Sequence, residues 1–73
     1  MNRYYLNIHL TALETEQLFY GSGIQTIIVT AENGLRVQLA IRHLVPFITR
    51  EGISGRFLLR TDSQQAFISL ERL

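Results

Sequence analysis

The chain has 73 residues, a formal net charge of +1 and no cysteine. This length fits one small domain, and a domain of that size buries only about 60% of the surface that its unfolded chain exposes. Without cysteine the chain has neither disulfides nor thiolate metal sites to stabilise it, and this composition is typical of a reducing compartment.

The sequence also argues against a membrane protein. No apolar run approaches the roughly 18 residues that a membrane-spanning helix requires. Asn7 and His9 interrupt the apolar pattern near the N-terminus, which therefore does not have the form of a signal peptide. We expect a single cytoplasmic domain over residues 1–73 with no membrane contact.

The first elements are a strand and a helix. Residues Tyr4 to Leu10 alternate between apolar and polar side chains, which predicts a half-buried strand. Thr11 and Glu14 have the spacing of a capping box, in which each side chain accepts a hydrogen bond from the backbone of the other residue. We expect a helix from Ala12 to Tyr20 that ends at Gly21-Ser22-Gly23.

A β-hairpin is predicted from Ile24 to Arg42, where Asn33-Gly34 joins two apolar-alternating runs. A two-residue turn would place Thr30 opposite Val37, a polar residue against an apolar one. A three-residue loop, Glu32-Asn33-Gly34, would instead place Val29 opposite Val37. Since a shift of one residue moves every side chain to the other face, the hydrophobic pattern favours the three-residue loop.

The remaining elements are less regular. Pro46 suits the first position of a short helix or 3₁₀ turn, where its missing N–H is not needed. Residues Ile53 to Thr61 and Ala66 to Leu70 are predicted to be the fourth and fifth strands, joined by the polar turn at residues 62–65. A four-residue loop there would pair Leu59 with Ile68.

These elements predict an α+β domain with a five-stranded antiparallel sheet. One helix lies between strands 1 and 2, and a short helical turn lies between strands 3 and 4. Because the strands are short and Gly55 allows a bend, we expect a strongly curled sheet or a small half-open barrel.

No residue pattern points to catalysis, a metal or a cofactor. Ser54 lacks the flanking glycines of a nucleophile elbow, and Gly21 and Gly23 are not followed by the lysine of a phosphate loop. His9 and His43 have no further ligands at metal-site spacing. We therefore expect a protein that is not an enzyme and that carries no cofactor.

The outward face offers two functional hypotheses. All seven basic residues are arginine, a residue suited to bidentate contacts. If strands 3 and 4 are neighbours, Arg36, Gln38, Arg56 and Arg60 form an outward stripe that could bind nucleic acid in a small barrel. A net charge of +1 is small for this role, because phosphate contacts supply most of the affinity.

The second hypothesis rests on the apolar residues Ile28, Leu58 and Phe67, which also face away from the predicted core. If the helix does not cover them, a second copy or another protein would bury this patch. We prefer this interpretation, a small protein-interaction or structural module that self-associates as a homodimer or binds a protein partner. Its predicted interaction surface comprises Arg36, Gln38, Arg56, Arg60, Ile28 and Leu58.

Four stretches of the chain resemble a bacterial family. They are Leu-Arg-Val-Gln-Leu at 35–39, His-Leu-Val-Pro-Phe-Ile-Thr at 43–49, Gly-Ile-Ser-Gly-Arg-Phe at 52–57 and Phe-Ile-Ser-Leu-Glu-Arg-Leu at 67–73. They resemble DUF2835, a family of small gammaproteobacterial proteins, over nearly the whole chain. The resemblance implies a compact cytoplasmic domain and supplies neither a function nor active residues.

Overall fold

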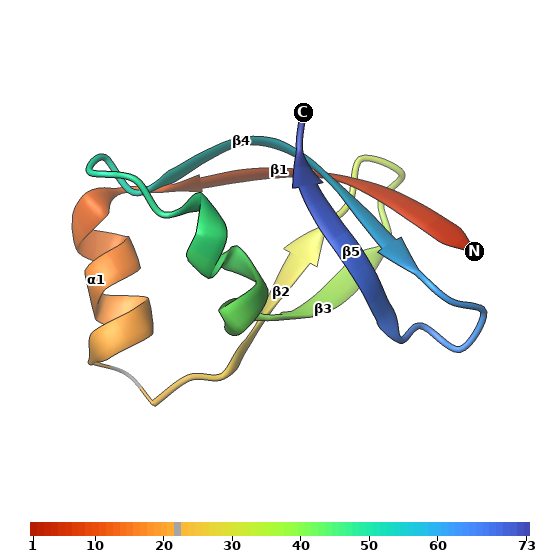
Figure 1. The fold of residues 1–73 in the computed structure, drawn as a ribbon, viewed down its shortest axis with the longest axis horizontal. Coiled ribbons are helices and arrows are strands. Elements are labelled where there is room, and N and C mark those ends of the chain that lie inside the picture. Colours follow the sequence, from red (N-terminus) through yellow and green to blue (C-terminus); the bar gives the residue numbers. More distant parts are fainter. Residues whose placement is uncertain (22) are drawn as a thin grey trace.

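The computed structural model describes residues 1–21 and 23–73, and Ser22, part of the predicted helix end, lies outside the described residues. Figure 1 shows an α+β arrangement that is mostly strand, with two short helices. In chain order the elements are β1 (Asn2–Leu10), α1 (Ala12–Tyr20), β2 (Thr26–Thr30), β3 (Arg36–Ala40), the 3₁₀ helix η1 (Ile41–Phe47), β4 (Ile53–Thr61) and β5 (Phe67–Arg72).

The predicted single sheet, strongly curled or closed into a half-open barrel, is not found. The five strands of the described chain form two antiparallel sheets, with the orders β1-β4-β5 and β2-β3. β1 pairs with β4 from Asn2 opposite Thr61 to Leu10 opposite Ile53. β3 is separate from β4, because η1 begins directly after β3 and carries the chain away from the hairpin (Figure 1).

The first strand and helix agree with the sequence prediction. Tyr4, Leu6 and Ile8 of β1 are buried, and the residues between them are exposed. The capping box is present, since the Glu14 N–H donates to Thr11 Oγ1 at 3.1 Å and the Thr11 N–H donates to Glu14 Oε1 at 3.0 Å. These local signals define the start of α1.

The β2–β3 hairpin has the predicted three-residue loop. Val29 lies opposite Val37, and the Ala31 N–H donates to the Leu35 carbonyl at 2.7 Å. Gly34 has a φ of +89°, the left-handed conformation that this loop type requires of its last residue. The hydrophobic pattern therefore predicted the register correctly.

The predicted helical turn is present between strands 3 and 4, but its position differs. The 3₁₀ helix begins at Ile41, which the alternating pattern had assigned to the hairpin, and Pro46 lies near its end. The early start has a packing reason, because it brings Leu44 into the core with no exposed surface.

The β4–β5 pairing differs from the predicted register, because Leu59 lies opposite Leu70. The loop joins Asp62 to Ala66 through three residues, and Gln65, with a φ of +67°, holds the place that Gly34 holds in the first hairpin. A bulge then shifts the pairing between Thr61 opposite Phe67 and Arg60 opposite Ser69. No residue pattern predicts this loop, since glutamine rarely adopts a positive φ.

The core lies between the two sheets, and α1 and η1 close one end of it (Figure 1). Its largest fully buried side chains come from three elements: Leu6, Leu44, Ile53, Phe57 and Leu59. Phe47 of η1 packs its ring edge-on against Phe57, with 5.2 Å between the ring centroids. None of the helices in the described residues is long and apolar enough to cross a membrane.

Gly52 marks a close approach between the start of β4 and the end of β1. It has a φ of +108°, and a Cβ at this position would lie 2.0 Å from the Leu10 carbonyl oxygen and 2.6 Å from the Thr11 carbonyl carbon. These neighbours are backbone atoms, which cannot move aside as a flexible side chain could.

We predict that Gly52→Ala lowers the free energy of unfolding by roughly 3 kcal/mol or more, because left-handed strain adds to a clash with backbone. Gly34→Ala is the matched control. Its φ is also positive, but nothing lies within 4 Å of the added Cβ, so we expect a loss of about 1–2 kcal/mol. Urea unfolding measures both variants, and equal losses would contradict the role assigned to the close approach.

Candidate functional site

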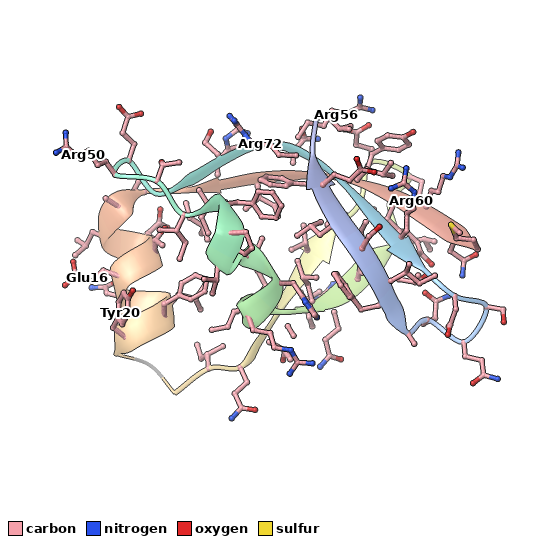
Figure 2. The ribbon with its side chains drawn as sticks, in the orientation of Figure 1. Glu16, Tyr20, Arg50, Arg56, Arg60 and Arg72 are labelled. Carbon is pink, nitrogen blue, oxygen red and sulfur yellow. The ribbon has the colours of Figure 1, made fainter. Side chains whose placement is uncertain are left out.

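The predicted arginine stripe is not formed. It required β3 and β4 to be neighbours, but these strands belong to different sheets. Arg36 and Gln38 are therefore separated from Arg56 and Arg60. Figure 2 shows Arg56 at the top of the molecule and Arg60 lower down, towards the right.

Arg56 is part of a clasp that joins the β2–β3 loop to the first sheet. Its Nε and Nη2 donate to the two carboxylate oxygens of Glu32 at 2.8 and 2.9 Å, and its guanidinium lies 4.5 Å from the centre of the Tyr5 ring. Asn7 donates to Glu32 Oε2 at 2.9 Å, and the Glu32 N–H donates to the Tyr5 carbonyl at 2.8 Å. Arg56 thus has a structural partner.

The rest of the predicted apolar and basic surface is also divided. Arg60 forms an ion pair with Glu71 of β5. Leu58 is only 6% exposed, whereas Ile28 is 60% exposed on the other sheet. The expectation that Leu58 and Ile28 contribute to one exposed patch is therefore wrong, because Leu58 is buried and the two residues lie in different sheets.

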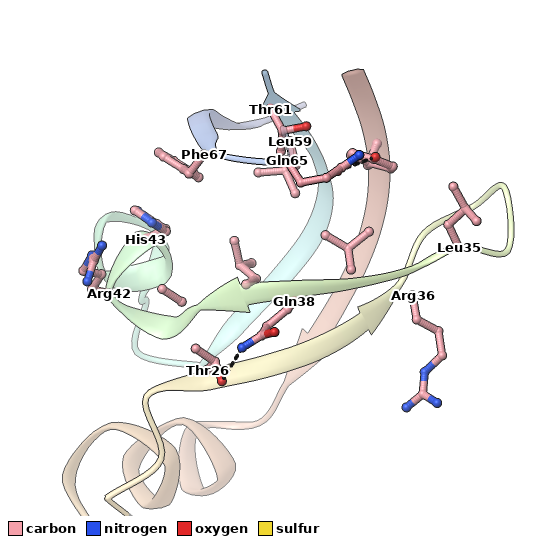
Figure 3. A pocket seen from close by; sticks show the side chains of 14 residues that line it. Thr26, Leu35, Arg36, Gln38, Arg42, His43, Leu59, Thr61, Gln65 and Phe67 are labelled. Carbon is pink, nitrogen blue, oxygen red and sulfur yellow. Dashed lines mark hydrogen bonds between the residues drawn. The ribbon is translucent and has the colours of Figure 1, made fainter. Parts of the chain in front are cut away.

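A cleft of about 630 Å³ lies between β3 and the β4–β5 hairpin (Figure 3). Six consecutive residues, Leu35–Ala40, line one wall. Successive side chains of a strand point to opposite faces, so an unbroken run of lining residues means that the edge of β3, rather than one face, borders the cleft.

The backbone of β3 is unpaired on this side. In the described residues β3 pairs only with β2. The Ala31 N–H donates to the Leu35 carbonyl, and the Ile41 N–H donates to the Gln25 carbonyl. Because hydrogen-bonded pairs alternate with non-hydrogen-bonded pairs along an antiparallel hairpin, Val37 and Leu39 are also hydrogen-bonded to β2. The N–H and C=O groups of Arg36, Gln38 and Ala40 must then point away from β2, towards the open edge.

The opposite wall comes from β4 and the turn that follows it. Leu59 and Thr61 line it, and Gln65 accepts a hydrogen bond from the Tyr4 hydroxyl at 2.7 Å (Figure 3). Thr61 is 4% exposed, and its Oγ1 has no hydrogen-bond partner among the described residues. A buried hydroxyl without a hydrogen-bond partner lowers the stability of the folded state, so Thr61 is an unsatisfied polar group in this wall.

An aromatic pair closes one end of the cleft. The rings of His43 and Phe67 stack with centroids 3.6 Å apart and planes within 3° of parallel. Burial lowers the pKa of His43, and the positive charge of Arg42 lowers it further. The imidazole is therefore uncharged near neutral pH and acts here as a flat aromatic surface.

The other histidine has a different environment, since His9 Nδ1 lies 3.0 Å from Ser54 Oγ of β4. Among residues 1–21 and 23–73, no three His, Cys, Asp or Glu side chains are grouped as ligands for a metal ion.

Of the six residues predicted to form the interaction surface, only Arg36 and Gln38 line the cleft. Sequence reasoning missed His43, Thr61 and Gln65. The sequence predicts a polar turn at Gln65, and it indicates no ligand partners for His43. The local pattern contained no signal that could bring Thr61 and Gln65 to β3, because the pairing of β4 with β1 decides where they lie.

We predict that the amides of β3 exchange with solvent in an alternating pattern. Val37 and Leu39 should be protected by their bonds to β2, whereas Arg36, Gln38 and Ala40 should exchange quickly. Hydrogen–deuterium exchange followed by NMR measures each amide separately. Uniform protection along residues 36–40 would show that the edge of β3 is occupied.

The clasp gives a second prediction. The hydrogen bonds from Arg56 hold the pKa of Glu32 below its usual value of 4.5, with a smaller contribution from Asn7, although partial desolvation opposes them. The stabilisation is therefore present above pH 4.5 and is lost as the pH falls through the lower folded pKa. Arg56→Gln should raise the pKa of Glu32, as measured by NMR titration.

Arg60→Gln is the matched control, because Arg60 pairs with Glu71 instead. We expect this variant to leave the pKa of Glu32 unchanged. Stability should also fall less in Arg56→Gln than in the unmodified protein between about pH 6 and pH 3, and an equal fall would refute the clasp as the cause.

The structure explains the residue block that carried the family resemblance. Gly52 permits the close approach to β1, Ile53 and Phe57 are fully buried, and Arg56 forms the clasp. A family model described as a protein of unknown function (DUF2835) matches residues 2–73. No curated protein and no solved structure matches the chain. Because the family model spans almost the whole sequence, this chain belongs to the DUF2835 family.

Proposed function

We propose that this protein is a non-enzymatic cytoplasmic interaction module that binds an extended segment of another protein by strand addition to β3. The observation that carries the proposal is the unpaired edge of β3 along one wall of the cleft. In strand addition, main-chain hydrogen bonds supply affinity, and pockets for alternate side chains supply specificity.

The cleft has the properties that such binding needs. Its volume of about 630 Å³ is within the range of roughly 300–1,000 Å³ that is common for binding sites. Exposed strand edges promote aggregation, and proteins usually cover them. Here β3 ends in η1, and the β4–β5 hairpin lies across the cleft without pairing with it, so the edge of β3 is left unpaired on the cleft side.

A second copy of the chain is a less suitable occupant. Antiparallel pairing of two β3 strands about Gln38 would set Arg36 of one copy opposite Ala40 of the other, without a clash of like charges. The second β3, however, would bring its own β2 and η1 with it. A single extended segment needs less space, so we favour a separate protein partner over the homodimer.

The nucleic-acid alternative has lost its main support. It depended on a continuous stripe, but Arg56 is paired with Glu32 and Arg60 with Glu71. Exposed cations that already have carboxylate partners contribute less to phosphate binding.

The cleft also favours binding over catalysis. His43 is stacked on Phe67, and Asp and Glu are absent from the described residues that line the cleft. A base without an orienting acid or an adjacent nucleophile does not form a hydrolytic arrangement.

Gln38→Pro tests the proposal. Proline removes the N–H of Gln38, which points away from β2, and its ring obstructs an incoming strand, while the hairpin bonds of Val37 and Leu39 remain. We expect peptides selected from a random displayed library on the unmodified protein to lose binding to Gln38→Pro by tenfold or more.

Ile28→Pro is the matched control. Ile28 lies directly opposite Gln38 in the hairpin, and its N–H also points away from the partner strand, but it does not line the cleft. The selected peptides should bind Ile28→Pro as they bind the unmodified protein. Peptides that bind Gln38→Pro equally well, or a selection that yields none, would overturn the proposal.

A further inference from the structure

The charges around the cleft indicate which kind of segment it would accept. Arg36 lies near one end of the β3 edge and Arg42 near the other, and both line the cleft. Neither forms an ion pair within the described part of the chain, in contrast to Arg56 and Arg60. With no carboxylate among its described lining residues, the cleft has an uncompensated positive charge.

The two faces of β3 differ in polarity. Figure 3 shows the side chains of Arg36 and Gln38 on the face turned away from Leu59 and Thr61. Val37 and Leu39 are on the other face and pack against the core. A strand added to this edge would continue both faces, because its side chains also alternate.

Cross-strand neighbours determine which residues suit each face. A carboxylate beside Arg36 on the outer face would form a favourable pair, whereas a lysine there would be repelled. On the inner face the added strand would meet Leu59 and Phe67, which favour apolar side chains.

Thr61 provides an independent indication of a ligand. The residue is 96% buried and lines the cleft, and its Oγ1 has no hydrogen-bond partner in the described residues. One small polar side chain among the inward-facing residues of the added strand would satisfy it. A segment that was apolar at every inward position would leave this hydroxyl unpaired.

We propose that the segment bound at β3 is an acidic one, in which carboxylates on the outer face alternate with apolar residues and one hydroxyl residue on the inner face. This inference rests on the strand addition proposed above and adds the chemistry of the partner. It identifies Arg36 and Arg42 as the residues that select an acidic segment, and Thr61 as the residue that selects the hydroxyl position.

The experiment uses the full chain and fluorescein-labelled ten-residue peptides, with binding followed by fluorescence anisotropy at low salt. The first peptide alternates glutamate with valine and has serine at one central inward position. Companion peptides replace glutamate by glutamine, replace glutamate by lysine, replace serine by alanine, or scramble the order. We expect the glutamate peptide to bind roughly fivefold more tightly than the glutamine peptide, as two exposed ion pairs would give.

Variants of the protein locate the effect. Arg36→Gln combined with Arg42→Gln should remove the preference for glutamate. Arg50→Gln should preserve it, because Arg50 is exposed but does not line the cleft. Thr61→Val should weaken the serine peptide by roughly two- to tenfold and leave the alanine peptide unchanged, as expected for one hydrogen bond.

The outcomes separate this inference from the proposed function. If the glutamine peptide binds as tightly as the glutamate peptide, and neither binds Gln38→Pro, the acidic preference is wrong but strand addition stands. If no alternating peptide binds, or if Gln38→Pro binds them all, strand addition itself is wrong. Equal binding of the scrambled peptide, or displacement of the acidic peptide by a single-stranded oligonucleotide, overturns the acidic-strand inference.

Discussion

The antiparallel pairing of β1 with β4 is the constraint on which the rest of the structure depends. It joins residues about fifty positions apart and places β4 in the centre of its sheet, with β1 on one edge and β5 on the other. The close approach at Gly52 fixes where this pairing begins. Because both edges of β4 are occupied, β3 cannot pair with β4; it pairs only with β2 in the described residues, and its other edge borders a cleft.

Local signals in the sequence were sufficient for α1 and for the β2–β3 hairpin. The capping box of Thr11 and Glu14 and the apolar alternation around Asn33-Gly34 each involve residues that are close in the chain. The β1–β4 pairing has no such local signature, so a single sheet in chain order was the wrong prediction. The β4–β5 register failed for a related reason, since Gln65 adopts a conformation that the sequence would normally mark with glycine.

The arginines show how far the candidate site could be predicted. Sequence reasoning correctly identified Arg36 and Gln38 as residues of a surface to examine, but it grouped them with Arg56 and Arg60. The structure separates these arginines by their partners. Arg56 and Arg60 hold elements together through Glu32 and Glu71, whereas Arg36 and Arg42 have no carboxylate within the described residues. Residue type alone cannot distinguish a structural guanidinium from an unpaired one, because the distinction depends on contacts between distant parts of the chain.

The clasp between Glu32 and Arg56 also bears on the rigidity of the cleft. It attaches the loop end of the β2–β3 hairpin to the first sheet, and η1 attaches the other end through buried Leu44. A strand held at both ends loses little conformational freedom when a ligand arrives, so most of the entropic cost of ordering the site is met during folding. The hairpin is therefore preorganised for binding. Discrimination between ligands would depend on how well they fit a wall whose conformation is already set.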